Sequence, residues 1–128
     1  MSKKSSKPKL LLTDRALSDI ASIEDYSIAT WGKRTAARYI DDLQSALDRI
    51  KQNPGLLCPE PEFHDTLCFH PVNKHVLVCD VQDNIVFVLT LLHASMDIPS
   101  RLSELAPSLV MEAEMLAEQL GRRRKRGR

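Results

Sequence analysis

The sequence predicts an α+β fold: an N-terminal strand and an antiparallel helical hairpin packed on a small, mostly antiparallel sheet of three to four strands, plus a C-terminal helix. Apolar residues recur at three- and four-residue spacing over residues 14–52, as on one face of a helix. Two short runs rich in β-branched residues, 76–80 and 85–92, flank polar turn residues, which indicates a hairpin. Strands that follow helices and are joined by short turns favour an antiparallel sheet.

The first two elements are a strand at residues 9–13 and a helix that follows it. Thr13 or Asp14 is expected to cap this helix, because a short polar side chain accepts from the free N–H groups of the first turn. Gly32 is expected to end it, since glycine readily takes the left-handed conformation at that position. The predicted apolar face consists of Leu17, Ile20, Ile23, Ser27, Ile28 and Trp31.

A second helix is predicted at residues 35–52, joined to the first by residues 32–34. Asn53 and Pro54 stop it, because proline cannot continue the hydrogen-bond ladder and asparagine tolerates a left-handed cap. Its apolar stripe has a regular 4-3-4-3 spacing and consists of Ala36, Ile40, Leu43, Leu47 and Ile50.

The second half of the chain carries the sheet. Residues 53–65 contain three prolines and are expected to form a loop, and residues 66–69 form a weak strand. Pro71 places the far end of that strand at a sheet edge or bulge. The run 85–92 is apolar at both parities, so we expect it to be the central strand and to be covered on both faces.

A C-terminal helix is predicted after Pro107, at residues 108–120, from an amphipathic pattern. Its apolar residues are Leu109, Val110, Met111, Met115, Leu116 and Leu120. Pro99 either ends a helix begun at Met96 or lies in the first turn of one that starts near Ile98. The C-terminal helix could cover the second face of the sheet, as a partner could, or it could mediate a homodimer.

Charge is distributed unevenly along the 128 residues. We expect one domain at residues 10–105, the C-terminal helix at 106–120, and basic tails at 1–9 and 121–128. The tails hold ten basic residues and no acid, so the rest of the chain holds eight basic residues against 17 acids, a net of −9. Such a body is a poor electrostatic match for nucleic acid, whereas the tails match it well. Solvated, disordered ends are the alternative interpretation.

Several classes of protein do not fit the sequence. No apolar stretch of signal-peptide length follows the basic N-terminus, and no run approaches the ~20 apolar residues that span a bilayer. Cys58, Cys68 and Cys79 are odd in number and form no CxxC pair, which does not support a disulfide framework or a zinc knuckle. We therefore expect a cytoplasmic protein with reduced thiols, no cofactor, no metal and no contact with a membrane.

Three blocks in a fixed order carry a resemblance to a known family. The first covers residues 13–32, the second covers 36–55 and ends after Asn-Pro, and the third is a His-x-Leu-Val segment from His75 followed by the run 85–97. The matching residues are Ala16, Asp19, Ile20, Tyr26 and Trp31 in the first block, and the His-x-x-Met-Asp residues His93, Met96 and Asp97 in the third. Together they resemble the ParE/RelE superfamily of toxins from type II toxin–antitoxin modules, the ParE branch most closely.

The resemblance implies a small bacterial toxin that a cognate antitoxin silences and that serves in plasmid stabilisation. ParE-like members poison DNA gyrase, whereas RelE-like members cut mRNA on the ribosome. Since both branches share one fold, the fold cannot decide between them. Three hypotheses follow: a gyrase inhibitor that acts by binding, a ribosome-dependent mRNA endonuclease, and a non-toxic member that acts as a protein-interaction module.

A ribonuclease needs a general base, a general acid and cations that stabilise phosphate. The candidates here are His93, Arg101 and His75, and the two histidines could form a proton-transfer pair. Alternatively, each histidine is a structural residue bonded to backbone or to Asp97. The family's usual Arg near residues 67–70 is replaced by Cys68-Phe69-His70, a departure that speaks against RNA cleavage.

The remaining candidate residues are surfaces for partners. The residues expected to bind an antitoxin or gyrase are Trp31, Lys33, Arg34, Arg38, Met96, Asp97 and Arg101. The residues expected to contact nucleic acid are Arg122, Arg123, Arg124, Lys125 and Arg126. Asp97 could also cap a helix that begins there, with Arg101 as its salt partner. Trp31 and Tyr26 are expected to pack within the helical hairpin.

Overall fold

The computed structural model describes residues 9–59, 67–82, 85–95 and 97–126. Its elements, in chain order, are β1 (Lys9–Leu12), α1 (Asp14–Trp31), α2 (Lys33–Gln52), the 3₁₀ turn η1 (Pro54–Leu56), β2 (Cys58–Pro59), β3 (Cys68–Val72), β4 (His75–Gln82), β5 (Ile85–His93) and α3 (Ile98–Arg126). The predicted α+β class is confirmed. No helix in these ranges is long and apolar enough to cross a membrane.

The sheet is mixed rather than purely antiparallel. Its strand order is β1-β5-β4-β3-β2, and β1 pairs with β5 in parallel while the other neighbours pair antiparallel. The chain between β1 and β5, which comprises the helical hairpin and strands β2, β3 and β4, returns β5 alongside β1 in the same direction. Because β2 and β3 extend the sheet on one side, β4 takes the middle place that we had predicted for β5.

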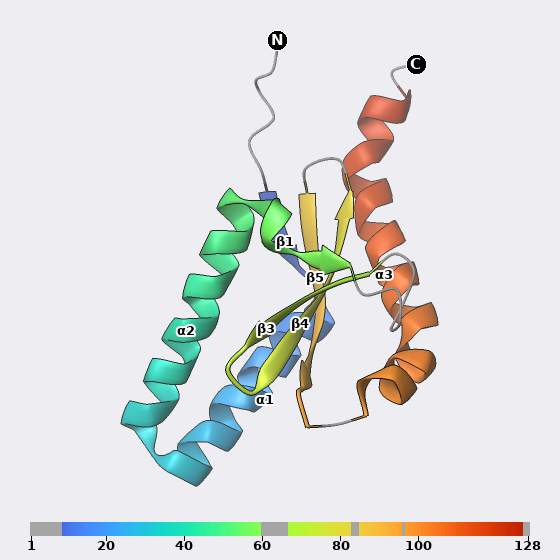
Figure 1. The fold of residues 1–128 in the computed structure, drawn as a ribbon. Helices are drawn as coiled ribbons and strands as arrows, with labels where there is room; N and C mark the ends of the chain where they lie inside the picture. The colour runs from blue at the N-terminus through green and yellow to red at the C-terminus, as the bar shows by residue number, and fades with distance from the viewer. Residues whose placement is uncertain (1–8, 60–66, 83–84, 96, 127–128) are drawn as a thin grey trace.

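Three layers make up the fold, with the sheet in the middle (Figure 1). The α1/α2 hairpin covers one face and α3 covers the other. Alternate residues of β5 belong to different cores: Val86 and Val88 pack toward the hairpin, and Phe87 and Leu89 pack toward α3. The prediction that this strand is covered on both faces is confirmed, and the C-terminal helix supplies the second cover.

The C-terminal helix is longer than predicted. It begins at Ile98 and continues through Pro107, where we had expected a new helix to start. Proline removes one backbone hydrogen bond, but Ile98, Leu102 and Leu109 are buried on the same core and hold both parts of the helix to the sheet. Met111 and Met115, predicted on its apolar face, are 59% and 55% exposed.

The ends of α1 follow the sequence closely. The hydroxyl of Thr13 accepts from the Ala16 N–H at 3.0 Å, as predicted for a cap, and donates to the Leu89 carbonyl at 2.9 Å. Gly32 ends the helix with φ 91°, as predicted. The apolar face is rotated from the prediction, since Leu17 is 51% exposed while the neighbouring Ala16 is fully buried.

Helix α2 confirms its predicted stripe, with Leu43, Leu47 and Ile50 buried. It starts earlier than predicted, at Lys33, so Gly32 alone joins the two helices. Asn53 does not take the predicted left-handed conformation: its φ is −142°, and its side-chain oxygen accepts from the Gly55 N–H at 3.3 Å instead.

Strand β3 lies further along the chain than the predicted 66–69, because it pairs with β4 as far as Val72. Pro71 is therefore inside the strand. It faces Val76 on β4, beyond the two-residue β2, which reaches only Cys68 and Phe69. This part of β3 is a sheet edge, where a missing N–H costs no ladder bond.

Candidate partner-binding site

A cluster of aromatic and imidazole rings lies where the α1/α2 turn meets the β3/β4 turn. Trp31 stands between Tyr26, at 6.0 Å in an edge-to-face arrangement, and Tyr39, at 6.3 Å in a stacked one. Tyr39 meets His75 at 5.6 Å, and His75 meets His93 at 5.0 Å. The five rings form a continuous row from the exposed end of α1 to the end of β5, which makes this corner rich in polarizable surface.

Hydrogen bonds hold the middle of this row. The Tyr39 hydroxyl is bonded to Nδ1 of His75 and accepts from the Lys74 N–H at 3.1 Å. Burial raises the pKa of Tyr39 above its usual value, and the nearby Asp42 carboxylate adds to this rise. Burial also lowers the pKa of His75, as does the charge of His93. At neutral pH the pair therefore consists of a neutral phenol and a neutral imidazole.

His93 is exposed and is bonded within its own turn. The Ser95 N–H donates to its Nδ1 at 3.1 Å, and the Ser95 hydroxyl lies 2.7 Å from the same atom. An acceptor nitrogen carries no proton, so the neutral ring holds its proton on Nε2. Each of the two histidines thus has its Nδ1 engaged by a neighbouring residue.

An open groove of about 490 Å³ runs beside this row. It is lined by Trp31, Thr35, Arg38, Tyr39, Asp42, Asn73 and Lys74. The Lys74 ammonium lies 5.2 Å from the centre of the Trp31 ring, a cation–π contact. At another point of the groove, the Asn73 amide donates to Asp42 at 2.9 Å and ties the β3/β4 turn to α2.

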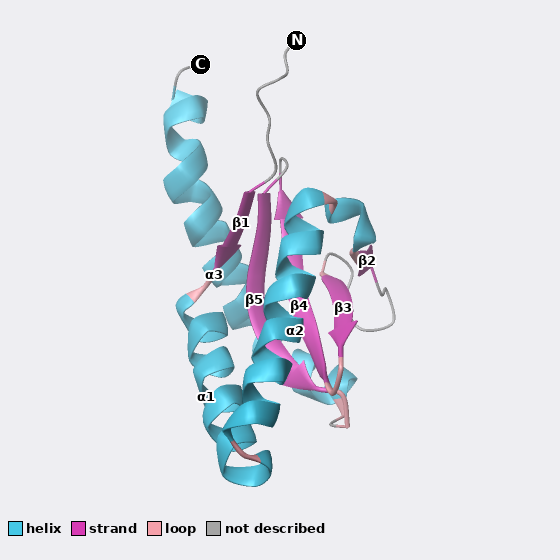
Figure 2. Ribbon diagram, turned by 90° about the vertical axis from the view of Figure 1, so that its left-hand side faces the viewer, coloured by secondary structure: helices cyan, strands magenta, loops and turns pink. Residues whose placement is uncertain are grey.

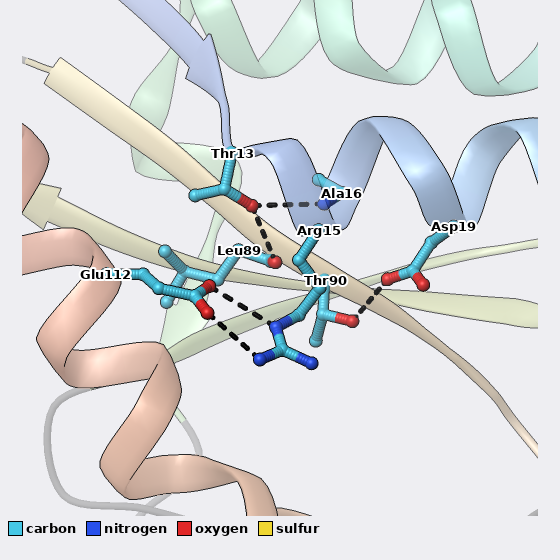
Figure 3. A network of polar contacts seen from close by, with 7 residues as sticks. All are labelled: Thr13, Arg15, Ala16, Asp19, Leu89, Thr90 and Glu112. Atoms are coloured by element: carbon cyan, nitrogen blue, oxygen red, sulfur yellow. Dashed lines mark hydrogen bonds and ion pairs between the residues drawn. The ribbon is translucent and has the colours of Figure 1, made fainter.

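A second polar network fixes α1 against β5 and α3 (Figure 3). Asp19 accepts from the Thr90 hydroxyl and, at 3.1 Å, from the Leu91 N–H. Arg15 forms a two-point ion pair with Glu112 of α3, at 2.9 and 3.3 Å. The Arg15 pKa is raised, chiefly by this hydrogen bond.

The comparisons with known proteins decide the family. Residues 10–98 match the family described as ParE toxin of type II toxin-antitoxin system, parDE. The chain belongs to the ParE toxin family. The match covers the hairpin and the sheet and ends at the first residue of α3. The comparison with curated proteins gave no match.

Solved structures agree with this ParE fold. The chain is similar to a structure of the chromosomal ParDE toxin–antitoxin system from P. aeruginosa, with a TM-score of 0.63, 15% identity, and coverage of 71% of this chain and 100% of that one. It is also similar to the RelBE2 toxin–antitoxin complex from Mycobacterium tuberculosis, with a TM-score of 0.51, 14% identity, and coverage of 73% and 100%. At these identities the similarity shows the fold. The resemblance to the ParE/RelE superfamily is confirmed.

Some of the predicted partner-binding residues of this ParE-family chain come together, and others do not. Trp31 and Arg38 line the groove. Lys33 and Arg34 are exposed in the first turn of α2, next to Trp31 in the chain. Met96 lies outside the described residues.

Asp97 and Arg101 belong to the start of α3. Asp97 caps the helix as predicted, since its carboxylate accepts from the Ser100 hydroxyl at 2.9 Å and from the Ser100 N–H at 3.4 Å. The predicted Asp97–Arg101 salt bridge is wrong, because Arg101 pairs with Glu104 at 3.1 Å. The helix position one turn further on offers Arg101 a carboxylate that the cap does not occupy.

Of the catalytic candidates, the structure brings together His75 and His93 across the β4/β5 register. Neither bonds to Asp97, since His75 is held by Tyr39 and His93 by Ser95. Within the described ranges, no three His, Cys, Asp or Glu side chains gather where they could hold a metal ion.

Five groove residues were not among the predicted partner-binding residues: Thr35, Tyr39, Asp42, Asn73 and Lys74. Tyr39 lies beside the predicted apolar stripe of α2 and could have been found as a polar-tipped member of it. Asn73 has φ 54°, a conformation that asparagine tolerates in turns. Lys74 gave no signal, because its place beside Trp31 depends on the approach of two residues that lie 43 positions apart in the chain.

Proposed function

We propose that this ParE-family chain inhibits DNA gyrase by binding it, without catalysis of its own, and that a cognate antitoxin neutralises it in the cytoplasm. Membership of the ParE toxin family supports gyrase as the target, because gyrase is the target that the resemblance to the ParE branch implies. The two structural relatives are toxin–antitoxin systems, which supports an antitoxin as the partner.

One observation carries the non-catalytic part of this proposal: both faces of the sheet are filled. Apolar side chains of the hairpin pack on one face and those of α3 on the other. The histidine pair sits at the edge of this core with both Nδ1 atoms engaged internally. RNA cleavage needs an open surface with a free base and fixed cations, and Arg101, the cation proposed for that role, is paired with Glu104.

The test measures two activities in the same samples. The purified chain is added to gyrase with relaxed plasmid, and in parallel to a translation extract in which transcript length is followed. We expect loss of supercoiling with intact transcripts. His93→Ala, at an exposed position outside the predicted partner-binding residues, should leave the inhibition unchanged.

Other outcomes separate the alternatives. Cut transcripts with unaffected gyrase, abolished by His93→Ala, would establish the mRNA endonuclease. A chain that affects neither gyrase nor transcripts and is harmless on expression would be the protein-interaction module, and its partner would then be sought by binding.

The basic tails extend the proposal to DNA. Strand β1 starts and α3 finishes at the same end of the molecule, whereas the α1/α2 turn lies at the opposite end (Figures 1 and 2). The α3 backbone is helical to Arg126, so the predicted nucleic-acid residues Arg122–Arg126 continue that helix. We propose that this end contacts the DNA that gyrase holds.

Deleting residues 121–128 should lower the affinity for duplex DNA and make it less dependent on salt, because fewer phosphate contacts release fewer counterions. Fluorescence anisotropy with a labelled duplex at several salt concentrations measures both. Equal affinity and equal salt dependence with and without residues 121–128 would remove the tail from the mechanism.

A further inference from the structure

The groove beside Trp31 has two cations that are not neutralised by ion pairs. Arg38 and Lys74 are both exposed, and within the described ranges neither forms a salt bridge with a carboxylate. The acid of the groove, Asp42, instead accepts from the Asn73 amide. The groove therefore has a surplus of positive charge next to an aromatic wall.

The start of α2 adds to this charge. Its N-cap is Gly32, which supplies no side-chain acceptor, and its first turn contains no acidic residue. The free N–H groups of a helix start carry a partial positive charge that normally attracts an anion. Here Lys33 and Arg34 occupy that turn, and Thr35, one residue further, lines the groove.

We propose that this groove binds an acidic segment of a partner protein, with a carboxylate held by Arg38 and Lys74 and an adjacent apolar side chain packed on Trp31. The partner we assign is the antitoxin, so this assignment rests on the proposed function. Trp31 is 40% exposed and supplies the apolar contact. A groove of about 490 Å³ has room for a few side chains, as in ordinary ligand pockets.

The arrangement around Trp31 favours a peptide over a nucleobase. A base would need to stack on a free indole face. Tyr39 stacks on this ring and the Lys74 ammonium lies 5.2 Å from its centre, so a stacking base would compete with both contacts, whereas an apolar side chain needs only part of the exposed indole surface. A carboxylate needs no such face: it can approach Lys74 from outside while the cation–π contact remains, and form a two-point bond with the Arg38 guanidinium.

The experiment uses Trp31 as its own reporter, because it is the only tryptophan in the chain. The full-length protein is titrated with the peptide acetyl-Glu-Leu-Leu-Glu-amide, and tryptophan emission is recorded. The matched probe is acetyl-Gln-Leu-Leu-Gln-amide, which has the same shape without the charge. Inorganic phosphate and a short single-stranded oligonucleotide serve as further arms.

We expect a saturable change in emission with the glutamate peptide, weakened by salt, and roughly ten-fold weaker binding of the glutamine peptide, as for the loss of a charge-assisted bond. Arg38→Gln and Lys74→Gln should each weaken binding several-fold. Arg49→Gln, at an exposed position near the other end of α2, should have no effect.

Four results would overturn the proposal. Equal responses to the two peptides would show that charge is not recognised. A response to phosphate as strong as that to the peptide would mean a simple anion site, and tighter binding of the oligonucleotide would mean a nucleic-acid site. An equal loss with Arg49→Gln would mean unspecific attraction.

The groove and the toxin function can fail separately. A harmless protein that still binds the glutamate peptide through Arg38 and Lys74 would keep the groove and lose the toxin. A chain that inhibits gyrase but does not bind the peptide would support the toxin function and contradict the proposed groove.

Discussion

The two faces of the sheet are covered in different ways. On the α1/α2 face, directional hydrogen bonds accompany the apolar packing: Asp19 binds Thr90 and Leu91 of β5, and Tyr39 binds His75 of β4. On the α3 face, the buried cluster consists of apolar side chains, namely Leu67, Phe69, Val76, Val78, Phe87, Leu89, Leu92, Ile98, Leu102, Leu109 and Ala113. A partly exposed ion pair, Arg15–Glu112, ties α3 to α1 (Figure 3).

This difference separates a part of the fold that is fixed in register from a part that is held mainly by apolar packing. Hydrogen bonds to strand backbone allow one position of the hairpin, because a shifted helix leaves buried polar groups without partners. Apolar packing carries no such directional penalty. The family match ends at residue 98, so the hydrogen-bonded part is also the part the family shares.

The two substitutions with the largest expected effects on stability test whether the α1/α2 hairpin and α3 unfold together or separately. Leu43→Ala in α2 and Leu109→Ala in α3 each remove a fully buried side chain. Leu43→Ala should lower the free energy of unfolding of the whole domain by about 2–5 kcal/mol, the usual cost of such a cavity. Leu109→Ala should mainly release α3, so that its amides exchange faster while those of the hairpin stay protected.

Hydrogen exchange read by mass spectrometry, together with urea unfolding, measures both. Equal loss of protection in the hairpin and in α3 for Leu109→Ala would show that the two covers unfold as one unit, and the comparison would no longer hold.

The next effect concerns the hydrogen bonds to β5. Asp19→Ala removes the acceptor of the Thr90 hydroxyl and the Leu91 N–H. Unsatisfied groups of this kind cost about 1–3 kcal/mol, so the urea midpoint should fall accordingly. Ser18→Ala, at the exposed neighbouring position, is the control and should stay within about 0.5 kcal/mol of the parent. A midpoint shift no larger for Asp19→Ala than for the control would remove these bonds from the account.

The stability of the packing on the α1/α2 face should also depend on pH, through His75. Its pKa is lowered by burial and by His93, so the unfolded chain binds a proton more readily than the folded one. Stability is therefore full above the ordinary histidine pKa of about 6.5 and is lost as pH falls through the folded pKa. The pKa of His70 is lowered too, by burial and by Arg49, and it contributes with the same sign.

Urea midpoints measured from neutral to mildly acidic pH test this. We expect His75→Gln to flatten the dependence, and His75→Gln with His70→Gln to flatten it further. An unchanged slope in the double variant would assign the pH dependence to other groups.

The elements that the sequence predicted well are those set by local rules. Thr13 and Gly32 punctuate α1 through the geometry of helix ends, and the stripe with Leu43 and Leu47 follows helix periodicity. The continuation of α3 through Pro107 could not be predicted in this way, because burial of residues on both sides of the proline outweighs a local breaker.

The candidate site was predicted only in part for the same reason. His75 and His93 face each other in the antiparallel β4/β5 pair. This contact could be foreseen, because the sequence predicted that the two residues lie on neighbouring strands. The groove depends on the approach of the β3/β4 turn to the helical hairpin: Lys74 contacts Trp31 at the end of α1, and Asn73 contacts Asp42 of α2. Sequence periodicity describes the faces of a single helix or strand, so it could not predict that these elements lie next to each other.

The smallest effect should come from the ion pair between the two covers. Arg15 and Glu112 are each 33% exposed, so water and salt screen their attraction. A double-mutant cycle with Arg15→Ala and Glu112→Ala should give a coupling of about 0.2–1 kcal/mol that declines with added salt. The Arg101–Glu104 pair within α3 is more exposed, at 49% and 68%, and serves as the control with a smaller coupling. A large, salt-independent coupling for Arg15–Glu112 would mean that α3 is anchored by a directional contact as firmly as the hairpin, and the two covers would no longer differ in kind.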